Sequence, residues 1–171
     1  GGYVCWVELS EDGATLYVNS WTGGTVHRVD VATAQVTHTA AVGQFPHATL
    51  PDAQGQYVYA LASGENVVKR LDALDLGAAV SLPGPHLGSW GGPVAAIRSR
   101  TGNHLFVTNY ATSNVTVLDI GAQSTTRDTV VHTAAVETSP VFLALSPDGS
   151  RLYVANNAAS TVTVVDTSSY R

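Results

Sequence analysis

The chain has 171 residues, of which 44% are hydrophobic and only 12% are charged, and its formal net charge is −5. The eight basic residues are scattered, which excludes the clustered Lys/Arg surface that nucleic-acid binding requires. No apolar run approaches the roughly 18 residues of a membrane span. The single cysteine, Cys5, excludes an internal disulfide, and its apolar neighbours predict a buried, inert thiol.

An internal repeat organises the chain. In each of four copies, a glycine precedes an aromatic residue by four positions and an aspartate follows that aromatic by thirteen. The four triplets are Gly13/Tyr17/Asp30, Gly55/Tyr59/Asp72, Gly102/Phe106/Asp119 and Gly149/Tyr153/Asp166. Repeats of ~40–50 residues that contain several strands each are typical of propeller blades.

Each copy contains up to four expected strands, and we expect no helix. The first copy has strands at Cys5–Leu9, Thr15–Ser20, Thr25–Asp30 and Val36–Val42, and the second at His47–Leu50, Tyr57–Ala62, Val67–Asp72 and Leu76–Leu82. The third has Val94–Ile97, His104–Asn109, Val115–Asp119 and Val130–Val136, and the fourth has Val141–Leu145, Arg151–Asn156 and Thr161–Asp166.

These elements predict an all-β fold, a β-propeller of four-stranded antiparallel blades. We expect residues 1–171 to form a single propeller segment, with blades near 3–42, 46–82, 93–136 and 140–167. The fourth blade lacks an outer strand, so the four blades are expected to belong to a larger ring of about seven. The remaining blades, or a protein partner that adds a strand beside Thr161–Asp166, would then complete the ring.

The motifs Phe106-Val107-Thr108-Asn109 and Tyr153-Val154-Ala155-Asn156, with the lead-in Ser146-Pro147-Asp148-Gly149, resemble the YVTN β-propeller repeat family. That family includes surface-layer-type and secreted proteins and grades into lactonase-like and cytochrome d1-like propellers. The resemblance covers essentially the whole chain. It implies the propeller fold and an extracytoplasmic location (periplasmic, secreted or cell surface), but it does not imply one activity.

Strand direction sorts the loops onto two faces, and large aromatic residues and two histidines collect on one of them. This aromatic rim contains Trp21, Phe45, His47, His86, Trp90 and Tyr110. Exposed aromatics with a polar handle are typical of recognition surfaces, although the same rings could simply seal loops. His47 could serve as a ligand contact, base or metal ligand, or it could be structural.

The repeated aspartates have an architectural interpretation, because each ends a strand where a carboxylate can accept backbone N–H groups of the next turn. We find no constellation of catalytic residues, no metal site and no cofactor motif. We therefore expect an extracytoplasmic binding or assembly module without catalytic activity of its own. The alternative is a lactonase-like hydrolase or a redox-enzyme subunit with a quinone or haem partner.

Overall fold

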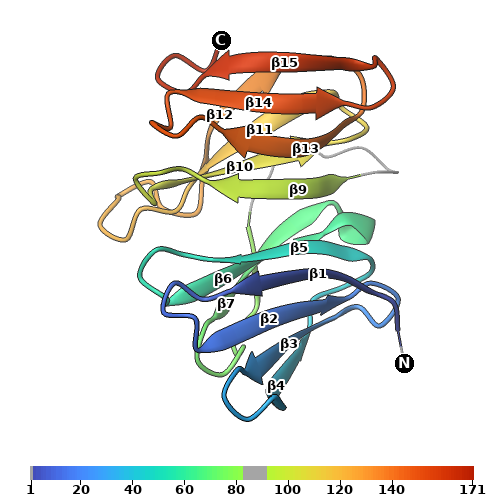
Figure 1. Ribbon diagram of the computed structural model, residues 1–171, viewed down its shortest axis with the longest axis vertical. Coiled ribbons are helices and arrows are strands. Elements are labelled where there is room, and N and C mark those ends of the chain that lie inside the picture. The colour runs from blue at the N-terminus through green and yellow to red at the C-terminus, as the bar shows by residue number, and fades with distance from the viewer. Residues whose placement is uncertain (1, 83–91) are drawn as a thin grey trace. The chain divides into compact units, whose positions relative to one another are not determined.

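The computed structural model describes residues 2–82 and 92–171, and the chain divides into two compact units, Gly1–Leu82 and Pro83–Arg171. Each unit contains two antiparallel sheets that follow one another along the chain (Figure 1). Three sheets have four strands and the fourth, within the described residues, has three. Each sheet corresponds to one predicted blade.

In the first unit, the first sheet has the strand order β1-β2-β3-β4 and the second β5-β6-β7-β8. The strands are β1 (Val4–Leu9), β2 (Thr15–Ser20), β3 (Thr25–Asp30), β4 (Gln35–Ala41), β5 (Pro46–Pro51), β6 (Tyr57–Ala62), β7 (Val67–Asp72) and β8 (Val80–Ser81). A short 3₁₀ helix, η1 (Ser63–Glu65), separates β6 from β7, so the expectation of no helix is wrong at this one turn.

In the second unit, the third sheet has the order β12-β11-β10-β9 and the fourth β13-β14-β15. The strands are β9 (Pro93–Arg98), β10 (His104–Asn109), β11 (Asn114–Asp119), β12 (Val130–Ala135), β13 (Pro140–Leu145), β14 (Arg151–Asn156) and β15 (Thr161–Asp166). β9 and β13 begin at a proline, a residue that has no N–H to donate and is therefore tolerated as the first residue of a strand.

The repeat alignment is confirmed by strand register. The aromatic residue is the third residue of its strand in all four sheets and pairs with equivalent neighbours, as in Phe106↔Val117 and Tyr153↔Val164. Tyr17, Tyr59 and Phe106 are buried, whereas Tyr153 is 36% exposed. The four positions are therefore equivalent in the backbone but not in their surroundings.

The predicted strand at Leu76–Leu82 is mostly wrong, because only Val80–Ser81 pairs with β7. Leu76 adopts φ 56°, and its N–H donates to the carbonyl of Asp72 at 3.0 Å, which closes a turn instead. Its side chain is buried beside Tyr17 in the core between the first two sheets. A leucine in the left-handed region costs about 1–2 kcal/mol, and burial of its side chain offsets that cost.

Tyr170 occupies the matching turn of the second unit, with φ 56° and an N–H that donates to the carbonyl of Asp166 at 2.7 Å. Its ring stacks on His132 with centroids 4.9 Å apart and meets Phe106 edge-on at 6.5 Å. In both units, therefore, a turn residue of the later sheet packs against the earlier sheet.

The architectural interpretation of the repeated aspartates is confirmed. Oδ1 of Asp30 accepts the N–H of Thr33 at 2.8 Å, Oδ1 of Asp72 accepts that of Leu74 at 2.8 Å, and Oδ1 of Asp119 accepts that of Gly121 at 2.9 Å. Oδ1 of Asp166 accepts the N–H groups of Ser168 and Ser169, and the Ser168 hydroxyl is the main cause that lowers the pKa of Asp166 to about 2.

Candidate functional site

Three residues of the predicted aromatic rim come together in the first unit. Trp21 follows β2, Phe45 precedes β5 and His47 lies at the start of β5. The rings of Trp21 and Phe45 have centroids 4.6 Å apart, and those of Trp21 and His47 are 6.3 Å apart and nearly perpendicular. All three side chains are half-buried, so their rings are both supported and partly accessible.

The other three predicted rim residues are not brought to this cluster. His86 and Trp90 lie outside the described residues. Tyr110 belongs to the second unit, where it is half-buried after β10 and its N–H donates to the carbonyl of Gly92 at 3.4 Å. The candidate site is therefore built from the first unit alone.

The backbone that presents Phe45 belongs to the repeat. Phe45 has φ 53°, and its carbonyl accepts the N–H of Ser63 at 3.3 Å. In the fourth sheet, Ser139 has φ 59° and accepts the N–H of Asn157 in the same way at 2.8 Å. The loops that contain Phe45 and Ser139 therefore share the left-handed conformation. They differ in that Phe45 carries a phenyl ring at this position.

His47 positions Trp21. The indole Nε1–H of Trp21 donates to Nε2 of His47 at 3.3 Å, and because an indole can only donate, Nε2 is unprotonated and the proton is on Nδ1. Burial lowers the pKa of His47, which favours the neutral ring that this hydrogen bond needs. Because this lone pair is occupied, His47 holds the indole in place and is not a free base.

Cys5 lies beside this site and is exposed, contrary to the expectation of burial. Its sulfur is nevertheless partly covered and donates to the carbonyl of Pro46 at 3.0 Å. Partial burial raises the pKa of the thiol, so Cys5 remains protonated and unreactive near neutral pH.

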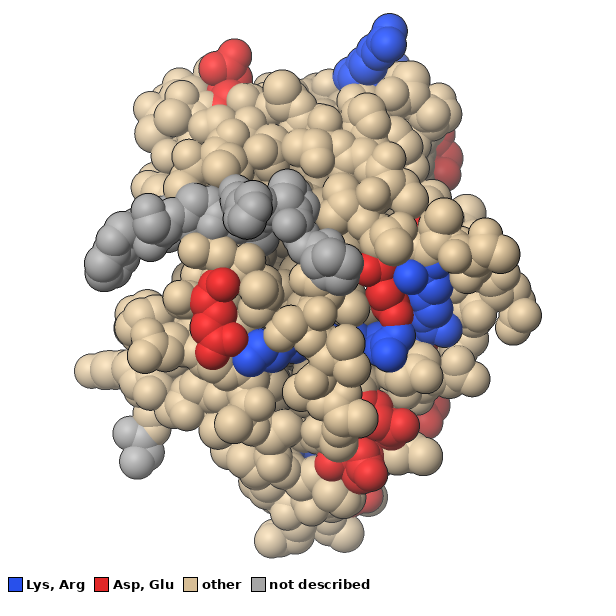
Figure 2. Space-filling view, turned by 180° about the vertical axis from the view of Figure 1, so that it is seen from behind, with Lys and Arg blue, Asp and Glu red and all other residues tan. Residues whose placement is uncertain are grey.

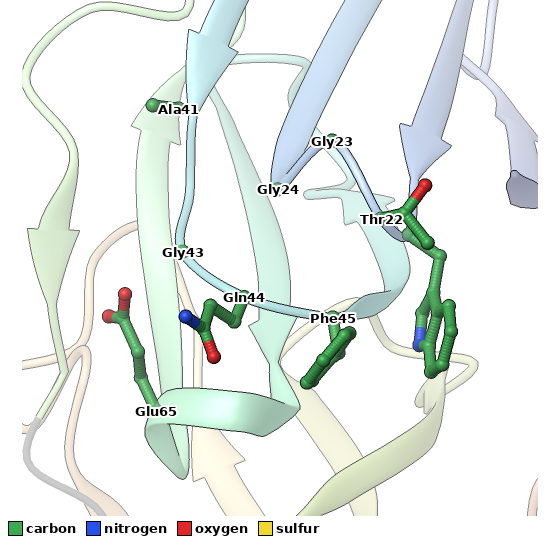
Figure 3. Close-up of a pocket in the computed structure, with 9 residues that line it drawn as sticks. Thr22, Gly23, Gly24, Ala41, Gly43, Gln44, Phe45 and Glu65 are labelled. Atoms are coloured by element: carbon green, nitrogen blue, oxygen red, sulfur yellow. The ribbon is translucent and has the colours of Figure 1, made fainter. Parts of the chain in front are cut away.

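An open pocket of about 410 Å³ lies next to the Trp21–Phe45 pair (Figure 3). Its lining comes from loops of the first unit, from the end of β4 and from η1, and consists of Trp21, Thr22, Gly23, Gly24, Ala41, Gly43, Gln44, Phe45 and Glu65. In Figure 3, Gln44 lies between Phe45 and Glu65, so that an amide separates the aromatic wall from the acidic wall.

Glu65, which ends η1, forms the acidic wall. Its carboxylate makes an ion pair with Lys69 at 2.7 Å and retains 42% exposure of the side chain. A Cβ at Gly43, which has φ 98°, would lie 2.1 Å from Glu65 Oε1, so only a glycine lets the carboxylate lie this close to the backbone. Glu65 was not among the candidate residues predicted from the sequence. It lies in a loop on the same face as the aromatic rim, and that position could have identified it.

The pocket combines groups that suit a neutral ligand with both an apolar face and hydroxyl groups. Two aromatic rings supply the apolar contact, while a carboxylate, an amide and a threonine hydroxyl supply hydrogen-bond partners. Within residues 2–82 and 92–171, no group of three or more His, Cys, Asp or Glu side chains could hold a metal ion. Figure 2 shows that most of the side chains in view are neither basic nor acidic.

Comparison with known proteins identifies the fold. The family model described as Lactonase, 7-bladed beta-propeller matches residues 86–169. Kuenenia stuttgartiensis hydrazine synthase is similar with a TM-score of 0.82 and 22% identity over 96% of this chain and 46% of that chain. The Pseudomonas aeruginosa periplasmic gluconolactonase PpgL has a TM-score of 0.78 and 22% identity over 99% of this chain and 52% of that one.

The sheets are propeller blades. A third similar structure, the dihydro-heme d1 dehydrogenase NirN in complex with DHE, has a TM-score of 0.80 and 18% identity over 98% of this chain and 36% of that one. The chain thus spans about half or less of the length of these three propellers. No curated protein matches the sequence.

The predicted propeller fold is confirmed. The match to the lactonase family model lies in the second half of the chain. The YVTN repeat assignment stays a prediction. In the part of the chain that the structure describes, no helix has the length and apolarity that crossing a bilayer requires.

Proposed function

We propose that this chain is part of a lactonase-like propeller and that the pocket of its first unit binds a neutral, polyhydroxylated cyclic ester, such as a sugar lactone. The observation that carries the proposal is that the Trp21–Phe45 pair and Glu65 line the same pocket. The lactonase family match and the gluconolactonase neighbour favour this function over a non-catalytic module.

Binding would use both walls. The C–H face of a sugar-derived ring can lie against Trp21 and Phe45, while its hydroxyl groups donate to the carboxylate of Glu65 and the amide oxygen of Gln44. The hydrogen bond from Trp21 to His47 holds the indole in one orientation, so little ordering is needed when the ligand arrives.

Ring opening would then require water, a proton acceptor and a proton donor. The water oxygen bonds to the carbonyl carbon and the ring C–O bond breaks, so the ring oxygen leaves as a hydroxyl. In this pocket Glu65 is the candidate to take the proton from water and return it to the leaving oxygen. The ion pair with Lys69 holds its carboxylate in position.

One observation favours a second candidate function. His47 has its Nε2 lone pair occupied by Trp21, so the pocket contains one candidate base instead of an acid–base pair. The same pocket could therefore bind a polyol without converting it, as a binding module would. We further propose an extracytoplasmic location, which the periplasmic gluconolactonase neighbour supports.

The test uses gluconolactone as substrate and sorbitol as a polyol that cannot be hydrolysed. Turnover is followed as proton release in a pH-stat after subtraction of spontaneous hydrolysis, and binding is followed by calorimetry. We expect Trp21→Ala to lose both binding and turnover, Glu65→Gln to lose turnover while binding sorbitol, and the control Glu137→Gln, an exposed acid of the second unit, to match wild type.

The hydrolase, the binding module and a pocket that is not a site predict different results. Binding without turnover in the wild-type chain would favour the binding module over the hydrolase. Full turnover by Glu65→Gln would remove Glu65 from the chemistry, and absence of both binding and turnover in the wild-type chain would refute the proposed site.

A further inference from the structure

A second pocket of the first unit, of about 210 Å³, lies between the turn that joins β1 to β2 and the turn that joins β5 to β6. Residues 10–12 and 53–55 of these turns line it, together with Thr15, Tyr17, Arg28, Ala73 and Leu74. We call this pocket the inter-blade cleft. It shares no lining residue with the pocket beside Trp21, and the proposed function does not use it.

The second unit covers the equivalent space with a side chain of the repeat. Arg100 is two residues before the turn glycine Gly102, and a Cβ at Gly149 of the next blade would lie 2.7 Å from Arg100 Cγ. The equivalent residues of the first unit are Glu11 and Gly55, and a Cβ at Gly55 would meet no atom within 4 Å. The first unit therefore leaves open a space that the second unit covers with an arginine stem.

Arg28 gives the cleft a positive group whose hydrogen bonds go to hydroxyl groups. Its Nη1 donates to Thr37 at 3.0 Å and its Nη2 donates to Thr15 at 3.2 Å. Its sheltered Nε–H has no partner among the described residues. The same register position in the third blade is the buried Val117, so a charge replaces an apolar residue here. Because a guanidinium has five N–H groups, others remain to bind a carboxylate.

Asp12 gives the same cleft a negative group with one oxygen available. Its Oδ1 accepts the hydroxyl of Ser10 at 2.5 Å and the N–H of Ala14 at 3.0 Å, whereas Oδ2 accepts no hydrogen bond from the described residues. The equivalent Asp148 uses both oxygens, because the hydroxyl of Ser150 donates to each at 2.9 Å. Ala14 stands where the repeat has Ser150 and carries no hydroxyl, which leaves Oδ2 of Asp12 for a ligand.

A chain of hydrogen bonds holds these two charged groups in one cleft. The hydroxyl of Ser10 donates to Asp12 and accepts the N–H of Thr15 at 2.9 Å, and the hydroxyl of Thr15 accepts Nη2 of Arg28. The Ser10 hydroxyl is also the main cause that lowers the pKa of Asp12, so its carboxylate is charged at neutral pH. A simple anion would be repelled by Asp12 and a simple cation by Arg28, so a ligand that carries both charges complements the cleft.

We propose that the inter-blade cleft binds a small amino acid as its zwitterion, with the carboxylate on the guanidinium of Arg28 and the ammonium group on Oδ2 of Asp12. Both contacts are charge-assisted hydrogen bonds. Each should contribute about tenfold or more to the affinity. The site does not depend on the lactone pocket, so either one can fail without the other.

The first experiment is a ligand-observed NMR titration of the chain with L-alanine. Propionate, which lacks the ammonium group, and ethylamine, which lacks the carboxylate, are titrated in parallel. We expect L-alanine to bind at least about tenfold more tightly than either compound. Absence of L-alanine binding, or equal binding of L-alanine and one of the two singly charged compounds, overturns the proposal.

The second experiment changes each contact in turn. Asp12→Asn keeps the Oδ1 acceptor of the turn but removes the charge, and Ala14→Ser restores the hydroxyl that occupies the second oxygen in the fourth blade. Arg28→Gln removes the partner of the ligand carboxylate. We expect each variant to weaken L-alanine binding by about tenfold. The matched control is Asp148→Asn, which makes the same change in the same turn of the fourth blade and should leave binding unchanged.

Thermal melting of each variant distinguishes a loss of binding from a loss of fold. Ala14→Ser should melt at or above the wild-type temperature, because its hydroxyl adds a hydrogen bond to the turn, and it therefore tests the site even if Arg28→Gln does not fold. Unchanged affinity in any folded cleft variant, or an equal loss of affinity in Asp148→Asn, overturns the proposal.

Discussion

Phe106 provides the sharpest test of how the blades are held together. Its side chain is 2% exposed and lies in the core between the third and fourth blades, with the ring of Tyr170 6.5 Å away. Burial of an aromatic side chain removes about 150–250 Å² from water. At about 25 cal/mol per Å², this corresponds to about 4–6 kcal/mol, part of which an alanine retains. We therefore expect Phe106→Ala to lower the free energy of unfolding by about 3–5 kcal/mol.

The assay is urea denaturation followed by far-UV circular dichroism, performed at a concentration where the chain is monomeric. The matched control is Tyr153→Ala, which removes the register-equivalent ring from the fourth blade, where it is 36% exposed, and should cost less than about 1 kcal/mol. A loss below about 1 kcal/mol for Phe106→Ala, or equal losses for the two variants, would refute the assignment of Phe106 to the inter-blade core.

Three further outcomes follow from other residues. Leu76→Ala should lower stability by about 2–4 kcal/mol because the side chain is buried in the core of the first unit, whereas a loss near zero in thermal melting would contradict that role. Gly43→Ala should weaken sorbitol binding in calorimetry, since a Cβ at this position would displace the Glu65 carboxylate, and unchanged affinity would argue against this wall of the pocket. Because burial lowers the pKa of His47 below 6.5, the unfolded chain binds the proton more readily. Stability from the neutral ring should therefore be present above about pH 6.5 and be lost as pH falls below it, and Trp21 fluorescence should change over the same range unless His47 is replaced by Phe.

The second strand of each blade was predicted with its observed bounds, as at Tyr57–Ala62 and Arg151–Asn156. Turn glycines and strand-ending aspartates mark these boundaries through local backbone chemistry, which does not depend on distant contacts. The strand predicted at Leu76–Leu82 was mostly wrong because the conformation of Leu76 depends on a distant contact. A leucine following an aspartate turn has strand-like composition, and only its burial against Tyr17 of the neighbouring blade makes the left-handed turn favourable.

The residues of the candidate site also divide into those that the sequence predicted and those that it did not. Trp21, Phe45 and His47 were predicted to share a face because strand direction assigns loops to one end of a sheet. Glu65 was not predicted, because its position depends on the close approach of its carboxylate to Gly43, which is more than twenty residues away in the chain. The expectation of a module without catalytic activity came from the absence of a local motif, and the lactonase family model that matches residues 86–169 is the reason why we propose the alternative.

The sequence by itself determined the β-propeller repeat, the strand order within a blade and the capping role of the aspartates. Each of these depends on interactions within about 50 residues, and the pattern recurs in every copy. Tertiary structure alone decided which equivalent residues are buried, so that Phe106 lies in a core while Tyr153 lies on a surface. It also decided that His47 supports Trp21 instead of acting as a free base. Both outcomes depend on which surface a neighbouring blade or loop supplies, and the pairing of residues within one repeat carries no information about that surface.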